Sequence, residues 1–163
     1  MWPEPVQRVA SFLRAAHAEA RLEEFDQDTP TAEDAARAAG AELAQIVKSV
    51  VCDCDSRTVV VLVPGDRKAD LAKVAAAAGV DRARVVPRDL VELRTGFEAG
   101  GVAPFPLPEG TDVFLDRTLL KQDHVWVGAG SERHLARLRP AELVRLAKAR
   151  QIDAVLDDTY HSN

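Results

Sequence analysis

Three short segments of this chain hold the residue types from which a chemical site can be built. They are Ile46-Val47-Lys48-Ser49-Val50, Thr95-Gly96-Phe97 running into Gly100-Gly101-Val102-Ala103-Pro104, and Trp126-Val127-Gly128-Ala129-Gly130. The first places a lysine in an apolar run, where an unpaired charge is unfavourable. The others place glycines where backbone amides can come close to a ligand. No Ser/His/Asp set or metal cluster accompanies them, so the pattern indicates a site of backbone amides and one fixed cation.

Lys48 has two interpretations. If strand periodicity holds, its side chain shares a face with Ile46 and Val50, and both faces of the strand are partly apolar. The ordinary interpretation is a lysine whose stem lies along the sheet while its ammonium reaches water. The functional one is a cation at the mouth of a pocket, where a phosphate or carboxylate would offset its partial desolvation.

The two glycine segments also have two interpretations each. Gly100 and Gly101 allow amides to point at a carbonyl oxygen and stabilise a developing oxyanion, and Pro104 then fixes the direction of the chain. Alternatively, they form an ordinary turn. The run from Gly128 to Gly130 is predicted as a turn after a strand, either as the wall of a pocket or as a tight hairpin.

The other reactive side chains suggest structural roles. Cys52 and Cys54 are two residues apart on a predicted strand, so they point the same way and are expected to be reduced thiols rather than a disulfide. The four histidines are dispersed and lack metal-ligand spacing, so no metal or cofactor is expected. Asp116 and Thr118 are expected to be turn or cap residues. A basic set near the C-terminus is expected to be a solvated face that could also meet RNA phosphates: Arg133, Arg137, Arg139, Arg145, Lys148 and Arg150.

The elements that must position these residues are short. Apolar spacing predicts a helix from Pro5 to about Arg21, and Thr31 caps a helix that ends at Gly40. The runs 45–54 and 58–64 form a hairpin, and the second is apolar enough to be covered on both faces. A helix over 68–78 follows. Residues 95–110 are a long irregular loop, of the kind that is usually functional in compact domains. Strands, a helix from Pro140 to about Arg150 and a last short element over 152–156 complete the chain.

The fold class is therefore mixed α/β, with one compact domain over 1–163 and a mixed, largely antiparallel central sheet surrounded by helices. The Gly128-Ala129-Gly130 run lacks the third glycine of a dinucleotide-binding fingerprint. No run is long enough to span a membrane, and the N-terminus lacks a signal peptide, so a cytoplasmic location is expected. The net charge of −5 argues against nonspecific DNA binding but allows a local basic pocket for one RNA end.

From about Thr31 to Leu146 the sequence resembles the YbaK/ProX aminoacyl-tRNA editing domains, relatives of the insertion domain of bacterial prolyl-tRNA synthetase. The matching pieces are Thr31-Ala32-Glu33-Asp34-Ala35-Ala36, Gln45-Ile46-Val47-Lys48-Ser49, Val61-Leu62-Val63-Pro64-Gly65-Asp66, Thr95-Gly96-Phe97, Gly100-Gly101-Val102-Ala103-Pro104 and Val127-Gly128-Ala129-Gly130. After the last residue of the Gly-x-x-x-Pro loop the family continues with an apolar residue and a glycine. Here Phe105 is followed by Pro106, a departure expected to reshape the pocket rim.

The resemblance implies a trans-acting deacylase that hydrolyses the ester of mischarged tRNA, above all tRNA(Pro) carrying alanine or cysteine. It implies that Lys48, Gly100 and Gly101 act in catalysis, with Lys48 holding the terminal adenosine region. It also implies that the substrate contacts Ile46, Val102, Ala103, Pro104, Gly128, Ala129 and Gly130. An activated ester needs little beyond a positioned water and a stabilised oxyanion. The partners that it implies are the tRNA acceptor end and, as a further candidate, a synthetase, with no membrane and no DNA. The alternative is a non-catalytic module that binds aminoacyl-adenosine or docks on a synthetase.

Overall fold

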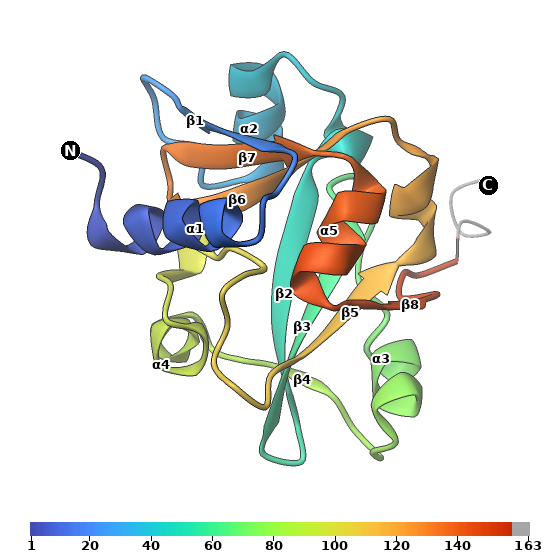
Figure 1. The fold of residues 1–163 in the computed structure, drawn as a ribbon. Coiled ribbons are helices and arrows are strands. Elements are labelled where there is room, and N and C mark those ends of the chain that lie inside the picture. The colour runs from blue at the N-terminus through green and yellow to red at the C-terminus, as the bar shows by residue number, and fades with distance from the viewer. Residues whose placement is uncertain (158–163) are drawn as a thin grey trace.

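The structure is a computed structural model that describes residues 1–157, and it contains two small sheets set at an angle (Figure 1). The three-stranded sheet has the order β1-β7-β6 and is antiparallel. The five-stranded sheet has the order β4-β2-β3-β5-β8, with parallel pairs β3–β5 and β5–β8 and antiparallel pairs elsewhere. The predicted mixed α/β class is confirmed. The strands are β1 Ala20–Glu24, β2 Val47–Cys54, β3 Arg57–Pro64, β4 Arg84–Val85, β5 Asp112–Asp116, β6 Val125–Ser131, β7 His134–Leu138 and β8 Arg150–Ile152.

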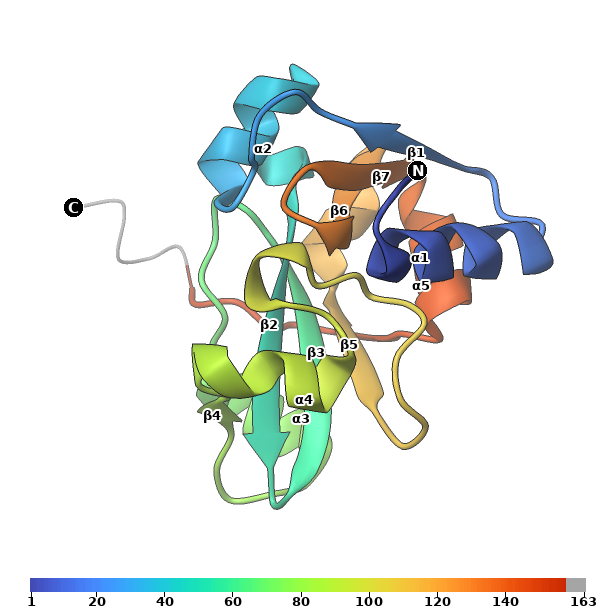
Figure 2. The same cartoon turned by 90° about the vertical axis from the view of Figure 1, so that its left-hand side faces the viewer.

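Five α-helices and four 3₁₀ turns among residues 1–157 cover these sheets. The helices are α1 Glu4–Ala15, α2 Ala32–Ala39, α3 Leu71–Ala78, α4 Val91–Thr95 and α5 Pro140–Ala147, and the 3₁₀ turns are η1 Leu43–Gln45, η2 Arg88–Leu90, η3 Ala99–Gly101 and η4 Arg117–Lys121. Helices α3 and α4 flank the five-stranded sheet from opposite sides (Figure 2). Within residues 1–157, no helix has the length and apolar character needed to cross a bilayer.

Three apolar clusters hold these layers together. The largest joins α1, α4 and α5 to both sheets, and its buried members include Val9, Val91 and Leu143. A second fills the space between the five-stranded sheet and α3, around Val74 and the reduced thiols of Cys52 and Cys54. A third packs α2 against the three-stranded sheet. Because β3 lies between the first two clusters, its residues 59–63 are fully buried on both faces, as predicted from their apolar run.

Local signals placed α2 and the central hairpin correctly. The Thr31 hydroxyl accepts a hydrogen bond from the Asp34 amide, and Gly40 ends α2 with a φ of 65°. Asp55 and Ser56 form the two-residue turn between β2 and β3, both with positive φ, as the right-handed twist of a hairpin favours.

The helix predicted over 68–78 begins later, at Leu71, because Asp70 caps it. Strand pairing displaced three further predicted boundaries. The first helix ends at Ala15 rather than near Arg21, because residues from Ala20 onward pair with β7. Helix α5 ends at Ala147, and the last strand, β8, occupies Arg150–Ile152 rather than 152–156. In each case a segment with helical or ambiguous periodicity is recruited as a strand by a partner distant in sequence.

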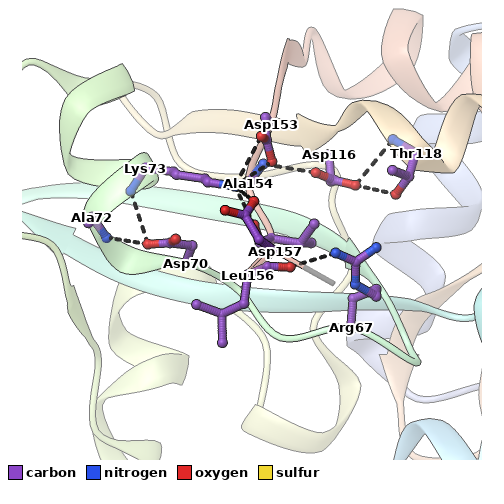
Figure 3. A network of polar contacts seen from close by, with 11 residues as sticks. Arg67, Asp70, Ala72, Lys73, Asp116, Thr118, Asp153, Ala154, Leu156 and Asp157 are labelled. Atoms are coloured by element: carbon purple, nitrogen blue, oxygen red, sulfur yellow. Dashed lines mark hydrogen bonds and ion pairs between the residues drawn. The ribbon is translucent and has the colours of Figure 1, made fainter. Parts of the chain in front are cut away.

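The segment after β8 is fixed by polar contacts (Figure 3). The Lys73 ammonium on α3 donates to Asp153 at 3.0 Å, to the Val155 carbonyl at 2.7 Å and to Asp157 at 2.9 Å. Asp116 caps η4 by accepting from the Thr118 amide, which confirms its predicted cap role, and it also accepts from the Ala154 amide at 2.8 Å. These contacts anchor the chain up to Asp157 against β5 and α3.

Candidate functional site

A cavity of about 400 Å³ opens where the two sheets meet. Its walls come from four places: the segment 29–33 that leads into α2, the start of β2, the turn η3, and the ends of β6 and β7 that face α2. A parallel bridge between Ile46 and Trp126 joins the two sheets beside it. The volume lies toward the lower end of the roughly 300–1,000 Å³ that is typical of ligand sites, so it suits a small group.

Lys48 lines this cavity from β2, where it pairs with Val63 of β3. Its side chain is half-buried, and among residues 1–157 its ammonium has no ion-pair or hydrogen-bond partner. Burial holds the pKa of the Lys48 ammonium below its ordinary value of 10.5, while the carboxylates of Glu33 and Asp66 act in the opposite direction. The cation is thus placed at the cavity with its hydrogen-bonding capacity unused.

The edge of β2 next to Lys48 is open. Strand β4 pairs with β2 only at Cys52 and Asp53, so within residues 1–157 no strand pairs with the outer edge of β2 from Val47 to Val50. Ser49 also lines the cavity, and its buried hydroxyl has no hydrogen-bond partner in the described part of the chain. A buried unpaired hydroxyl is unfavourable unless a ligand or water meets it. The sequence analysis missed Ser49 because a serine in a strand carries no distinctive signal.

The turn η3 forms the wall opposite β2. Gly101 is required by close approach to β6, because a Cβ there would lie 2.7 Å from the backbone nitrogen of Ser131. A Cβ on Gly128 would overlap the Val102 carbonyl oxygen in the same way. The Gly101 amide already donates to the Glu98 carbonyl at 2.9 Å. The amides of Ala99, Gly100 and Val102, the residue after η3, have no backbone partner in this segment, and all three residues line the cavity.

The run Gly128–Gly130 is not the turn that the sequence suggested. All three residues belong to β6, with a shift in the β6–β7 register between Gly128 and Ser131. Gly130 has a φ of 107°, and a Cβ there would lie 2.8 Å from the backbone of Pro5 and Val6 at the start of α1. Gly128 and Gly130 thus allow two other backbone segments, at Val102 and at the start of α1, to approach β6 closely. No local sequence pattern reveals these contacts.

The cavity brings half of the predicted site residues together. Ile46, Lys48, Gly100, Val102 and Gly128 line it. The other five lie outside its lining: Gly101, Ala103, Pro104, Ala129 and Gly130. Ala103 and Ala129 have no exposed surface and belong to the largest apolar cluster, and Pro104 borders a separate hollow on the far side of the loop. Residues that the sequence did not single out for the site complete the lining, among them Thr29, Glu33, Ser49, Gly65 and Leu135.

The rim of the cavity is fixed by one carbonyl. The Glu132 oxygen in the β6–β7 turn accepts from the Thr29 amide at 2.5 Å and from the Thr29 hydroxyl at 2.6 Å. These two bonds hold the segment that leads into α2 against the turn. Glu33, in the first turn of α2, is thereby held in the lining of the cavity. Its carboxylate is close enough to Lys48 to interact with the ammonium electrostatically.

A serine–histidine contact that the sequence did not predict lies behind this wall. Ser131 Oγ is 2.6 Å from His134 Nδ1, and His134 Nε2 is 3.6 Å from Glu24. Burial holds the pKa of the His134 imidazole below its ordinary value of 6.5. Leu135, the next residue on β7, lines the cavity, and neighbouring residues of a strand point to opposite faces. The His134 side chain therefore lies on the face of β7 away from the cavity, where it contacts Trp2. The pair belongs to the hairpin turn rather than to the cavity.

Comparison with known proteins identifies the family to which the chain belongs. Residues 26–146 match the model of the aminoacyl-tRNA editing domain. The chain is 34% identical over 121 residues to the uncharacterized protein YwhH of Bacillus subtilis, covering 74% of this chain and 76% of that protein. It is 27% identical over 124 residues to EbsC of Enterococcus faecalis, named as a candidate Cys-tRNA(Pro)/Cys-tRNA(Cys) deacylase, with 75% of each chain covered.

Solved structures agree with this match. A crystal structure described as a candidate trans-editing enzyme for prolyl-tRNA synthetase superimposes with a TM-score of 0.88 and 32% identity, covering 96% of this chain and all of that one. The hypothetical protein APE2540 superimposes with a TM-score of 0.86 and 29% identity, covering 91% of this chain and 99% of the other. The likeness therefore extends over nearly the whole described fold.

Proposed function

Because this chain belongs to the aminoacyl-tRNA editing domain family, we propose that it is a trans-acting deacylase that hydrolyses the ester of a mischarged tRNA. The most favoured substrate is tRNA(Pro) carrying alanine or cysteine. The observation that carries the proposal is the cavity itself, whose lining combines the unpaired Lys48 cation, the start of β2 and the backbone of Ala99, Gly100 and Val102. The lining formed by residues 1–157 contains hydroxyl groups but no histidine or cysteine, and such a site suits an ester that is already activated.

The reaction needs one water and no covalent intermediate. The water oxygen attacks the aminoacyl carbonyl carbon, and the tetrahedral intermediate carries its negative charge on the former carbonyl oxygen. We assign the stabilisation of that charge to the Gly100 and Val102 amides. The ester C–O bond then breaks, the ribose oxygen leaves and takes up a proton, and the products are the free amino acid and tRNA. Gly101 acts indirectly, by letting η3 approach β6.

Lys48 binds the substrate rather than attacking it. A lysine ammonium is a compact charge suited to phosphate or ribose oxygens, and the partial burial of Lys48 strengthens such a contact. Ser49 Oγ, which lacks a partner among residues 1–157, is placed to hold the attacking water or a ribose hydroxyl. We assign the choice of amino acid to the size of the part of the cavity that receives its side chain, and selection by size discriminates weakly against smaller amino acids.

We assign the whole chain to one domain located in the cytoplasm, where mischarged tRNA arises. Helix α1 lies outside the segment that matches the family, but its Val9 and Leu13 pack in the same cluster as β6 and β7. Its removal would expose that cluster. We propose a synthetase as a further partner, since the related structure is described in connection with prolyl-tRNA synthetase.

The second candidate is a module that binds aminoacyl-adenosine without turnover. This alternative was suggested by the departure from the family pattern at Phe105-Pro106. Phe105 is buried and stacks on Phe12 with ring centroids 5.1 Å apart, while Pro106 borders the separate hollow and not the candidate cavity. The departure therefore leaves the lining of the candidate cavity unaltered, which favours the deacylase.

A deacylation panel tests the proposal. The substrates are tRNA(Pro) charged with alanine, cysteine, serine or proline, and other tRNAs charged with alanine or serine. The variant Lys48→Met keeps the length of the stem and removes the charge, and Lys68→Met removes an exposed neighbouring charge that does not line the cavity. We expect rapid loss of one noncognate ester, a decrease of about 100-fold or more in kcat/KM for Lys48→Met, and little change for Lys68→Met. Absence of hydrolysis across the panel, with retained binding of a non-hydrolysable analogue, would favour the binding module.

A further inference from the structure

The face of the three-stranded sheet that turns toward α2 carries two arginines directly opposite each other. Arg21 of β1 pairs with Arg137 of β7, and Arg137 pairs in turn with Trp126 of β6. Helix α2 covers the Trp126 end of this face through the third apolar cluster. The arginines border a separate hollow of about 220 Å³, together with His124 and Arg139. We call this surface the arginine face.

Two like charges opposite each other in a sheet are unfavourable unless an anion lies between them, because directly opposed Cβ atoms are only about 4.5–5.5 Å apart. Among residues 1–157, neither Arg21 nor Arg137 has an ion-pair or hydrogen-bond partner. Other arginines of the basic set are neutralised within the chain: Arg133 by Asp28, Arg139 by Glu19 and Arg145 by Glu142. Glu19 also borders this hollow, but its carboxylate pairs with Arg139, so an anion from outside would meet two unpaired guanidinium groups.

The arginine face continues the wall of the candidate cavity. Arg137 lies two residues beyond Leu135 on β7, and Trp126 lies two residues before Gly128 on β6, so all four share one face of the sheet. Leu135 and Gly128 line the cavity. Two residues of a strand span about 6.6–6.8 Å. Arg137 therefore lies about that distance along β7 from a residue of the cavity wall, beyond the part of the sheet that α2 covers.

We propose that the arginine face binds the phosphate backbone of the tRNA acceptor stem, next to the 3′ end held in the cavity. This inference rests on the proposed function. Phosphate contacts position a nucleic acid without reading its sequence, and double-stranded RNA is recognised mainly through its backbone and shape. With a net charge of −5, the protein repels RNA over most of its surface. A local pair of unneutralised guanidinium groups beside the cavity then sets the orientation of the incoming RNA.

The test measures binding of an uncharged hairpin RNA that reproduces an acceptor stem with its single-stranded CCA end. The variants are Arg21→Gln, Arg137→Gln and the double variant, and the matched control is Arg82→Gln, an exposed arginine between α3 and β4. We expect Kd to rise about fivefold for each substitution, and the slope of log Kd against log salt to fall by about one per arginine. The control is expected to stay within about twofold. Thermal unfolding should show no loss of stability, because a repulsive pair is removed.

A second readout separates this inference from the proposed function. The double variant should lose kcat/KM on mischarged tRNA by about tenfold or more but hydrolyse an aminoacyl-adenosine ester, which lacks the stem, at the rate of the parent protein. Equal losses on both substrates would place the arginines in the cavity and overturn the inference. An unchanged Kd and salt slope in the double variant would also overturn it. If the parent protein hydrolyses no mischarged tRNA yet binds the hairpin through these arginines, the deacylase proposal fails while the arginine face stands.

Discussion

Gly128 of β6 lies directly under the Val102 carbonyl, so close that no side chain fits between them. Val102 directly follows η3, so this contact holds η3 close to the three-stranded sheet. Both residues line the candidate cavity, and their separation limits its width. Two glycine segments about 25 residues apart in the sequence thus meet backbone to backbone. The cavity owes its shape to main-chain spacing more than to any reactive side chain.

Gly128→Ala should therefore displace η3 and impair catalysis more than stability. We expect a loss of about 1–3 kcal/mol in the free energy of unfolding, typical of overpacking, and a loss of activity that persists at temperatures where the variant is fully folded. The control is Gly79→Ala, which has a φ of 74° but open space around its Cβ, far from the cavity. It should lose about 1 kcal/mol and retain activity. Full activity in folded Gly128→Ala would contradict the role of this contact.

Lys48 should give the activity a distinctive alkaline limit. Burial lowers the pKa of its ammonium below 10.5, so the cation is lost at a lower pH than for an exposed lysine. We expect kcat/KM, corrected for spontaneous ester hydrolysis, to fall as pH rises through this lowered pKa. Lys48→Arg should move the decline to higher pH, because arginine stays charged. Coincident pH profiles of the parent protein and Lys48→Arg would refute the assignment.

The same lowered pKa affects stability with a definite sign. Between the folded-state pKa of Lys48 and its ordinary value of 10.5, the unfolded chain binds more protons than the folded one. Stability should therefore increase with pH over this window relative to Lys48→Met, in which the titrating group is absent. Chemical denaturation of both proteins at several alkaline pH values measures the difference.

Ser131 should be dispensable for hydrolysis, despite its 2.6 Å contact with His134. The side chain of His134 lies on the face of β7 opposite to the cavity, so the pair cannot reach an ester bound there. We expect Ser131→Ala to keep kcat within about threefold of the parent value, since general-base activation of a serine typically contributes far more. A loss of several orders of magnitude, in a protein that remains folded, would instead identify a serine nucleophile.

Glu142 on α5 should account for part of the acid sensitivity of the fold. The guanidinium of Arg145 and the Glu19 amide, which donates at 2.7 Å, lower the pKa of the Glu142 carboxyl to about 2. Its contribution is present above the ordinary value of 4.5 and is lost as pH falls toward 2. Glu142→Gln should cost about 2 kcal/mol at neutral pH and progressively less below pH 4.5. The exposed Glu109→Gln serves as the control in denaturant titrations, and a pH-independent difference for Glu142→Gln would contradict the linkage.

Much of the fold could be predicted because its signals are local. Thr31 and Gly40 mark both ends of α2 by their own conformations and hydrogen bonds, and the apolar run 59–63 required a strand covered on two faces. The division into two sheets could not be predicted, since it depends on β1 pairing with β7 over more than 110 residues of sequence. Pairing at such distance leaves no trace in a sequence window.

The candidate site was predictable in part for a similar reason. Lys48 stood out because a lysine in an apolar strand is unusual, and the structure places it at the cavity. The glycines were also recognisable in the sequence, but their structural role was not. Gly101 contacts the backbone of Ser131 and Gly130 contacts the start of α1, and these segments come together only in the folded chain. Ser49 was overlooked because an unsatisfied hydroxyl is recognisable only once its surroundings are known.

The backbone contacts of Gly101, Gly128 and Gly130 have a genetic consequence. A side chain introduced at any of them would clash with main-chain atoms. Replacing a neighbouring residue by a smaller one would not remove those atoms. In a selection for restored function, alanine variants at these positions should yield true revertants rather than second-site suppressors. The residues that line the cavity with side chains are free of this restriction. The side chains of the cavity lining can therefore diverge between relatives while the backbone frame of the cavity stays the same.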